Sequence, residues 1–165
     1  MAEAAPGRVA LLSIRPEYAR ALLNGEKRVE FRRQPLAPDV TRVVIYATAP
    51  VRLIVGAFEV AGIERHTPSA AWARYSSEGG IGKAAFDLYY AGASVAVVIR
   101  ALNPRAADRP IRLDEVRAGM RPPQSFMYLP HDSLPPEIEG RSHLRVAGPQ
   151  PDWSDALAGR SARGV

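Results

Sequence analysis

The pattern of hydrophobic and polar residues up to residue 129 predicts a sheet of about five or six short strands. Apolar runs of strand length, rich in β-branched residues, occupy residues 9–14, 41–48, 51–63 and 94–102. Residues 27–33 alternate instead, which places Val29 and Phe31 on the strand face directed toward a core. A short apolar stretch before residue 129 completes the set.

Helical spacing is found over residues 16–24, 68–75 and 83–90, with a helical turn over 113–119. Pro16 fits the first turn of its helix, and Gly25 ends that helix because glycine adopts the left-handed conformation readily. Thr67 precedes Pro68 as an N-terminal cap. Residues 103–110 have turn-forming composition, and we expect a loop there.

Strands and helices do not alternate regularly, which argues against a doubly wound parallel sheet. The order favours an α+β fold, a small mixed β-barrel with short flanking helices. We expect three regions: a flexible lead over residues 1–8, one domain over 9–129, and an irregular Pro-rich tail over 130–165. Trp153 could anchor this tail to the domain.

The composition excludes several kinds of site. The chain of 165 residues has no cysteine, which excludes disulfides, thiolate metal sites and a cysteine nucleophile. His66, His131 and His143 lie far apart, so we expect no metal site and no cofactor. No apolar run reaches the ~18 residues of a membrane span, and the first residues lack the features of a signal peptide. We therefore expect a cytoplasmic protein with no membrane partner.

The charge balance favours an anionic partner. Lys and Arg number 22 against 17 Asp and Glu, a formal net charge of +5, and nucleic acid is the first candidate. Only Lys27 and Lys83 are lysines. A lysine, unlike an arginine, can lose its proton when it is buried, which makes these two positions candidates for chemistry.

Residues 77–84, S-E-G-G-I-G-K-A, resemble a phosphate-binding loop only in part. Ser77 stands where such a loop has its first glycine, and Ala84 stands where it has a magnesium-binding hydroxyl. We therefore interpret this segment as a flexible loop between two helices.

The segment from Gly25 to Arg33 carries the strongest candidate chemistry. Lys27 lies where the end of a helix meets the start of a strand, and strand parity places Glu30 beside Arg28 and Arg32. One interpretation is a charged solvent face with a local ion network, which contributes little to stability. The other is a mouth of mixed charge beside an apolar pocket, suited to a nucleotide phosphate or a base edge.

The same segment, G-E-K-R-V-E-F-R, resembles the G-x-K-x-x-E-x-R signature of ASCH domains, members of the PUA-like superfamily. The segments S-I-R-P-E-Y-A-R-A-L-L-N, Arg42–Thr48, V-G-A-F-E-V and P-P-Q-S-F-x-Y-L are also similar to bacterial and archaeal ASCH proteins, in the same order over residues 9–129. The resemblance implies a small β-barrel with helices flanking a cleft, and a role in RNA or nucleotide binding.

The family that the chain resembles is functionally mixed. It includes RNA-binding or coactivator modules, ribonucleases and an amidohydrolase branch that acts on N4-acetylcytidine. In that branch the signature carries a lysine and, three residues on, a threonine nucleophile. Lys27 matches the lysine, whereas Glu30 stands at the threonine position. A carboxylate can act as a general base but does not simply replace a hydroxyl nucleophile.

Ser125 and Gln124, in P-P-Q-S-F, are further candidates. They would line the cleft if the last strand folds back beside Lys27. Alternatively, Ser125 caps a backbone group in a turn.

Ser13, Arg15 and Tyr18 are predicted at the rim of the same cleft. Arg15 could bind phosphate, and Tyr18 or Tyr46 could stack on a base. Tyr18 could equally be only a core contact of its helix.

Three functions stay open on these residues. In a binding domain for RNA or a nucleotide-like small molecule, Arg15, Lys27, Arg28 and Arg32 would meet phosphate, and Glu30 would accept hydrogen bonds from a base or sugar. The second is a metal-independent hydrolase, either a ribonuclease or a modified-nucleoside amidohydrolase.

In that hydrolase Lys27 would be the base or electrostatic stabiliser, Glu30 the general acid or base, and Ser125 a participant. The third function is a regulatory module that works with a protein partner.

Overall fold

The computed structural model describes residues 6–139. Its strands are β1 (Arg8–Ile14), β2 (Val29–Arg32), β3 (Val40–Ala47), β4 (Leu53–His66), β5 (Ala96–Ile111) and β6 (Phe126–Leu129). Its helices are α1 (Pro16–Asn24), α2 (Pro68–Tyr75), α3 (Lys83–Tyr89), α4 (Leu113–Val116), the 3-10 turn η1 (His131–Ser133) and α5 (Pro136–Glu139). The predicted α+β class with six strands and short helices is confirmed.

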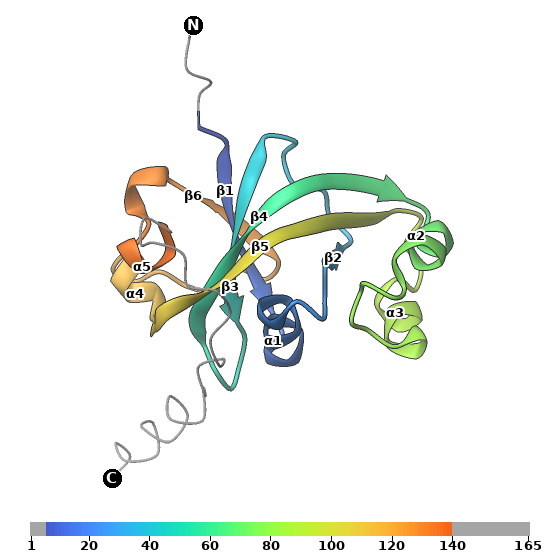
Figure 1. Cartoon of the computed structure of the whole chain (residues 1–165), viewed down its shortest axis with the longest axis horizontal. Coiled ribbons are helices and arrows are strands. Elements are labelled where there is room, and N and C mark those ends of the chain that lie inside the picture. The colour runs from blue at the N-terminus through green and yellow to red at the C-terminus, as the bar shows by residue number, and fades with distance from the viewer. Residues whose placement is uncertain (1–5, 140–165) are drawn as a thin grey trace, which may run out of the picture.

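The six strands form one curved mixed sheet in the order β2-β5-β4-β3-β1-β6 (Figure 1). β1 and β3 run parallel, and the other neighbouring pairs are antiparallel. The two edge strands, β2 and β6, do not pair with each other in the described part of the chain. The sheet is therefore open, which corrects the prediction of a closed barrel. Each edge strand has four residues, too few to close the ring.

β4 and β5 form a long twisted ribbon that extends beyond β3, and β2 pairs with β5 in this extended part (Figure 1). β5 continues to Ile111 where a loop was predicted over residues 103–110. The partner strand explains the difference, because Ala57 pairs with Arg105 and Gly56 with Ala106. The turn-forming residues remain within β5 because the pairing with β4 is irregular at several points. One of these residues, Asn103, has a φ of 48°.

The predicted helix ends are confirmed at both α1 and α2. Gly25 follows α1 with a φ of 82°, and its N–H donates to the carbonyl of Leu22. The Oγ1 of Thr67 accepts a hydrogen bond from the N–H of Ala70 at the start of α2. These caps fix where α1 and α2 meet the sheet.

Three apolar clusters cover the sheet. The first lies between the sheet and α1 and includes Ala19 and Leu22. The second lies on the opposite face under α4 and α5, where Leu134 and Ile138 are buried. The third lies under α2 and α3 at the far end of the ribbon (Figure 1). Residues 131–139 of the predicted tail thus contribute to the core, whereas Trp153 lies outside the described residues.

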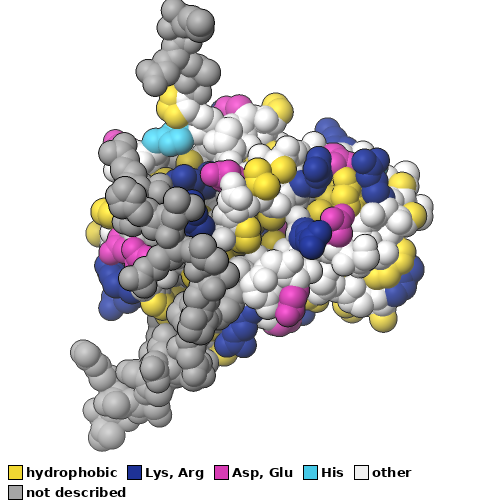
Figure 2. All heavy atoms as spheres, in the orientation of Figure 1, with side chains coloured by type: hydrophobic (Ala, Val, Ile, Leu, Met, Phe, Trp, Pro, Cys, Tyr) yellow, Lys and Arg dark blue, Asp and Glu magenta, His cyan; other side chains and the backbone are white. Residues whose placement is uncertain are grey.

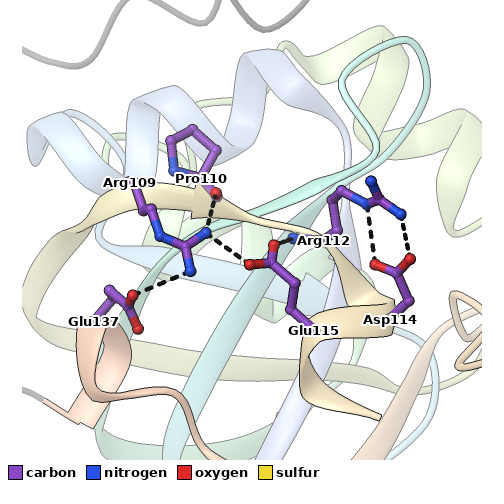
Figure 3. A network of polar contacts seen from close by, with 6 residues as sticks. All are labelled: Arg109, Pro110, Arg112, Asp114, Glu115 and Glu137. Atoms are coloured by element: carbon purple, nitrogen blue, oxygen red, sulfur yellow. Dashed lines mark hydrogen bonds and ion pairs between the residues drawn. The ribbon is translucent and has the colours of Figure 1, made fainter. Parts of the chain in front are cut away.

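An exposed network of polar contacts ties α4 and α5 to the end of β5 (Figure 3). The guanidinium of Arg109 lies 2.8 Å from Glu115 and 3.2 Å from Glu137, and Arg112 pairs with Asp114. On the face shown in Figure 2, basic side chains lie among acidic and apolar ones rather than in one stripe. Within residues 6–139 no helix is both long and apolar enough to span a bilayer.

Candidate functional site

A pocket of about 320 Å³ opens where the end of β1, the start of α1, β2 and α3 come together. Its walls combine apolar, aromatic and charged side chains, contributed by Ser13, Ile14, Arg15, Tyr18, Lys27, Glu30, Phe31, Arg32, Ile81, Ala85, Leu88 and Tyr89. The volume lies near the lower end of the range of about 300–1,000 Å³ that small-molecule sites occupy. The pocket therefore has the volume of a small site that could hold one small-molecule-sized group.

Lys27 lies at the base of this pocket with a relative exposure of only 3%. Its ammonium donates a hydrogen bond to the carbonyl of Gly79, and its Nζ lies 3.6 Å from a carboxylate oxygen of Glu30. The rings of Tyr18 and Phe31 are centred 5.2 and 5.3 Å from the same nitrogen. The lysine is thus held from four directions by α1, β2 and the loop after α2.

Glu30 joins Lys27 to Arg32. The Nε of Arg32 lies 3.2 Å from the second carboxylate oxygen of Glu30, and its Nη2 donates to the carbonyl of Ser13 at 2.8 Å. Glu30 and Arg32 are 6% and 7% exposed. The interpretation of this segment as a charged solvent face is therefore wrong. Both faces of β2 are covered, because α1 lies on one side and α2 and α3 lie on the other.

Burial lowers the pKa of the Lys27 ammonium below its usual value. The nearby carboxylate of Glu30 opposes this shift, and the positive charge of Arg32 adds to it. An amine of this kind can exchange a proton with a ligand more readily than an exposed lysine. We refer to Lys27, Glu30 and Arg32 as the buried charge group.

The loop between α2 and α3 packs closely against this group. A Cβ at Gly79 would lie 2.4 Å from the ring of Phe31, and one at Gly80 would lie 3.0 Å from the Cβ of Lys27. Gly80 also has a φ of +61°. The glycines that sequence analysis assigned to a flexible loop therefore let the backbone approach Lys27 and Phe31.

The structure brings six of the predicted site residues to the pocket, namely Ser13, Arg15, Tyr18, Lys27, Glu30 and Arg32. Arg28 is exposed and is not among the wall residues. Gln124 is exposed and Ser125 is half-buried, and neither lines the pocket.

Ser125 nevertheless lies directly behind the pocket, where its carbonyl accepts a hydrogen bond from the N–H of Ser13 at 3.1 Å. The hydroxyl of Ser13 donates to the carbonyl of Pro123 at 2.6 Å. The last strand and the segment before it fold back beside β1 and not beside the Lys27 strand, so the condition under which Gln124 and Ser125 would line the cleft is not met.

Tyr46 lies on the other face of the sheet, which corrects its predicted place beside Lys27. It packs in the cluster under α4 and lines a second hollow with Arg52 and Arg112. The reason is strand parity, since the neighbours Ile45 and Ala47 occupy the α1 face.

Sequence analysis missed the outer wall of the pocket, which is formed by Ile81, Ala85, Leu88 and Tyr89. Leu88 is 79% exposed and Tyr89 is 38% exposed, and no pattern in the sequence shows that these two side chains border a pocket. Within residues 6–139 no cluster of three or more His, Asp or Glu side chains is arranged to hold a metal ion.

The open mixed sheet with short helices around a pocket defines the chain as PUA-like, the class that its sequence predicted. The model of the ASCH domain matches residues 12–105. The ASCH domain-containing ribonuclease of Zymomonas mobilis is 36% identical over 124 residues, which is 73% of this chain and 83% of that protein. The chain belongs to the ASCH domain family.

Solved structures agree with this assignment. The crystal structure of ASCH from Zymomonas mobilis matches with a TM-score of 0.71 and 33% identity, over 76% of this chain and 90% of that one. Structures of a tyrosine-to-phenylalanine and a serine-to-alanine mutant of the same protein match equally well, with TM-scores of 0.71. The large ribosomal subunit protein uL22 of Ureaplasma parvum is 30% identical over 120 residues, which is 72% of this chain but 38% of that protein.

Proposed function

We propose that this ASCH domain binds RNA in the pocket above the buried charge group. The observation that carries the proposal is the placement of Lys27, Glu30 and Arg32, which are buried together at the base of a pocket open to solvent. Buried ionisable groups that line a pocket are far more typical of binding or catalytic sites than of structural ones. The relative at 36% identity is named a ribonuclease, which makes RNA the first ligand to test.

The walls suit the two chemistries of a nucleotide. Tyr18, Phe31 and Tyr89 line the pocket, and aromatic side chains stack on unpaired bases. Arg15 is exposed at the rim, where it can meet a phosphate without loss of hydration.

A pair of lysine variants tests this proposal. We expect Lys27→Met to weaken binding of a fluorescent single-stranded RNA by tenfold or more in an anisotropy titration. Lys83→Met is the matched control, because Lys83 is exposed on α3 and pairs with Asp87. Equal affinity of both variants and the unmodified protein would contradict a role for the pocket, provided that thermal melting shows both variants folded.

The alternative function is RNA hydrolysis at the same pocket, favoured by the name of the relative and by the lowered pKa of Lys27. Lys27 would then act as a general base and Glu30 as its proton partner. Incubation with end-labelled RNA, in EDTA and in magnesium, followed by a denaturing gel, tests for cleavage. Lys27→Arg keeps the positive charge but removes a side chain that can lose its proton near neutral pH. Loss of cleavage in this variant would support Lys27 as the general base, and full cleavage would exclude that role.

Ser125 is the remaining hydroxyl in the hydrolase proposal. Its backbone contact with Ser13 places it behind the pocket rather than in it. We therefore expect Ser125→Ala to retain more cleavage than Lys27→Met. If Ser125→Ala instead lost more cleavage than Lys27→Met, the reacting groups would have to lie nearer to the segment before β6 than to Lys27.

A further inference from the structure

The buried charge group has more hydrogen-bond donors than acceptors. The Lys27 ammonium has three N–H donors, and within the described residues it is directed to two acceptors, the Gly79 carbonyl and the Glu30 carboxylate. The Arg32 guanidinium has five N–H donors, of which one hydrogen bond, to the carbonyl of Ser13, is formed within residues 6–139. The Nε of Arg32 is buried and lies near Glu30 without a hydrogen bond to it.

The single carboxylate of the group is shared between the two cations. One oxygen of Glu30 faces Lys27 at 3.6 Å, and the other faces Arg32 at 3.2 Å. Two cations and one anion leave a surplus of positive charge on side chains that are less than a tenth exposed. A ligand is therefore held best through an oxygen that accepts from these donors.

The walls above the group favour a planar heterocycle over a bare phosphate. Tyr18 and Phe31 flank the ammonium, and Ile81 and Leu88 of the outer wall are apolar. A phosphate is strongly hydrated and finds the exposed Arg15 at the rim without being buried. A nucleobase instead fills the apolar space and presents only its polar edge to the group.

We propose that the pocket selects a base whose inner edge carries a carbonyl oxygen, with adenine the least favoured base. This inference rests on the proposed binding of RNA and names the part of RNA that enters the pocket. Hypoxanthine, guanine, uracil and cytosine each have a carbonyl oxygen that can accept from Lys27 and Arg32. Adenine has no carbonyl oxygen and accepts only through its ring nitrogens, and the amino group at its 6 position presents donors to the donors of Lys27 and Arg32.

A matched pair of ligands tests the selection on the unmodified protein. The first is a fluorescent tetra-adenylate, and the second is the same molecule with inosine at its second position. The two differ only in one base, where the 6-amino group of adenine is replaced by a carbonyl oxygen and N1 carries a hydrogen, and they share their phosphates, sugars and length. We expect the inosine ligand to bind about tenfold more tightly in an anisotropy titration.

Two variants locate the selection in the protein. We expect the preference for inosine to fall below about threefold in Lys27→Met and to persist in Lys83→Met. Arg32→Lys keeps a cation near Glu30 but removes the planar fork, and it is expected to reduce the preference as well. Thermal melting identifies any variant that fails to fold, and the ligand pair on the unmodified protein remains decisive in that case.

The possible outcomes distinguish failure of the base selection from failure of the proposed RNA binding. If longer RNA binds in a Lys27-dependent manner but the two ligands bind equally, RNA binding stands and the base selection is overturned. Tighter binding of tetra-adenylate overturns the selection in the same way. If no RNA binds, the proposed function fails and the selection fails with it.

Discussion

Both the buried charge group and the exposed network around α4 pair an arginine with a glutamate, and these two pairs differ in burial. In the buried charge group, the Arg32–Glu30 pair is separated by 3.2 Å, and both side chains are less than a tenth exposed. In the network that ties α4 and α5 to β5, Arg109 lies 2.8 Å from Glu115, yet its side chain is 53% exposed. Figure 3 shows this second network with its contacts.

The comparison shows why ion-pair distance alone does not identify a site. An exposed pair is hydrated and screened, and it contributes about 0–1 kcal/mol. A buried pair has lost its water, and removal of one partner costs about 3–5 kcal/mol because a charge remains buried without compensation. The burial of this group beside an open pocket is the reason why we propose it, and not the exposed network, as the ligand site.

The strongest test of the contrast is removal of the shared carboxylate. Glu30→Gln leaves Lys27 and Arg32 buried without an anion, and we expect the free energy of unfolding to fall by about 3–5 kcal/mol. Chemical denaturation measures the loss. Glu115→Gln in the exposed network is the matched change, with an expected loss below about 1 kcal/mol. Similar losses in the two variants would show that burial does not separate the two groups.

The backbone contact with Lys27 provides a second test. Gly79→Ala places a methyl group against the ring of Phe31, and we expect a loss of about 1–3 kcal/mol in unfolding free energy together with weaker RNA binding. Gly82→Ala is the control in the same loop, because a Cβ there meets no atom within 4 Å. A neutral Gly79→Ala variant would show that the loop does not hold Lys27.

The titration of Lys27 sharpens the comparison further. Because its folded-state pKa lies below the unfolded value, the unfolded chain binds the proton more tightly. The free energy of unfolding therefore rises with pH between the lowered pKa and about 10, with a slope of about 1.4 kcal/mol for each pH unit in that interval.

NMR on lysine-labelled protein tests this directly, since the chain has only two lysines and Lys27→Met assigns the signals. Titration of Lys27 at or above the value of a free lysine would contradict the burial argument. The slope of stability against pH should also be smaller in Lys27→Met than in the unmodified protein.

The smallest effect is expected in the exposed network. Arg109→Ala removes contacts with Glu115 and Glu137, and we expect a loss of at most about 1 kcal/mol that shrinks further in high salt. Chemical denaturation at low and high salt measures both quantities. A loss of several kcal/mol that salt does not change would show that this network is as important to the fold as the buried group.

Much of the fold could be predicted from local patterns. The ends of α1 and α2 follow from Pro16, Gly25 and Thr67, whose conformational preferences act over a few residues. The nearness of Glu30 and Arg32 also follows from strand parity, whereas Lys27 has the opposite parity and approaches Glu30 because it precedes the first residue of β2. These features depend on residues that are close together along the chain, so they can be predicted from the sequence.

The remaining features depend on which distant segments cover a strand. Alternation in residues 27–33 predicts two faces, but it does not show that α1 covers the face of Glu30. The contact between Lys27 and Gly79 joins residues 52 positions apart, and no local pattern indicates it. The extension of β5 depends in the same way on pairing with β4.

The outer wall of the pocket belongs to an excursion that leaves and re-enters the sheet at adjacent points. His66 at the end of β4 pairs with Ala96 at the start of β5, and residues 67–95 lie between them. The β4–β5 pairing therefore fixes both ends of this excursion, while its middle covers Val29 and Phe31 and supplies the Gly79 carbonyl to Lys27. An engineer who exchanges this segment between its two anchor points has to rebuild those contacts, because the buried lysine and the edge strand β2 depend on them.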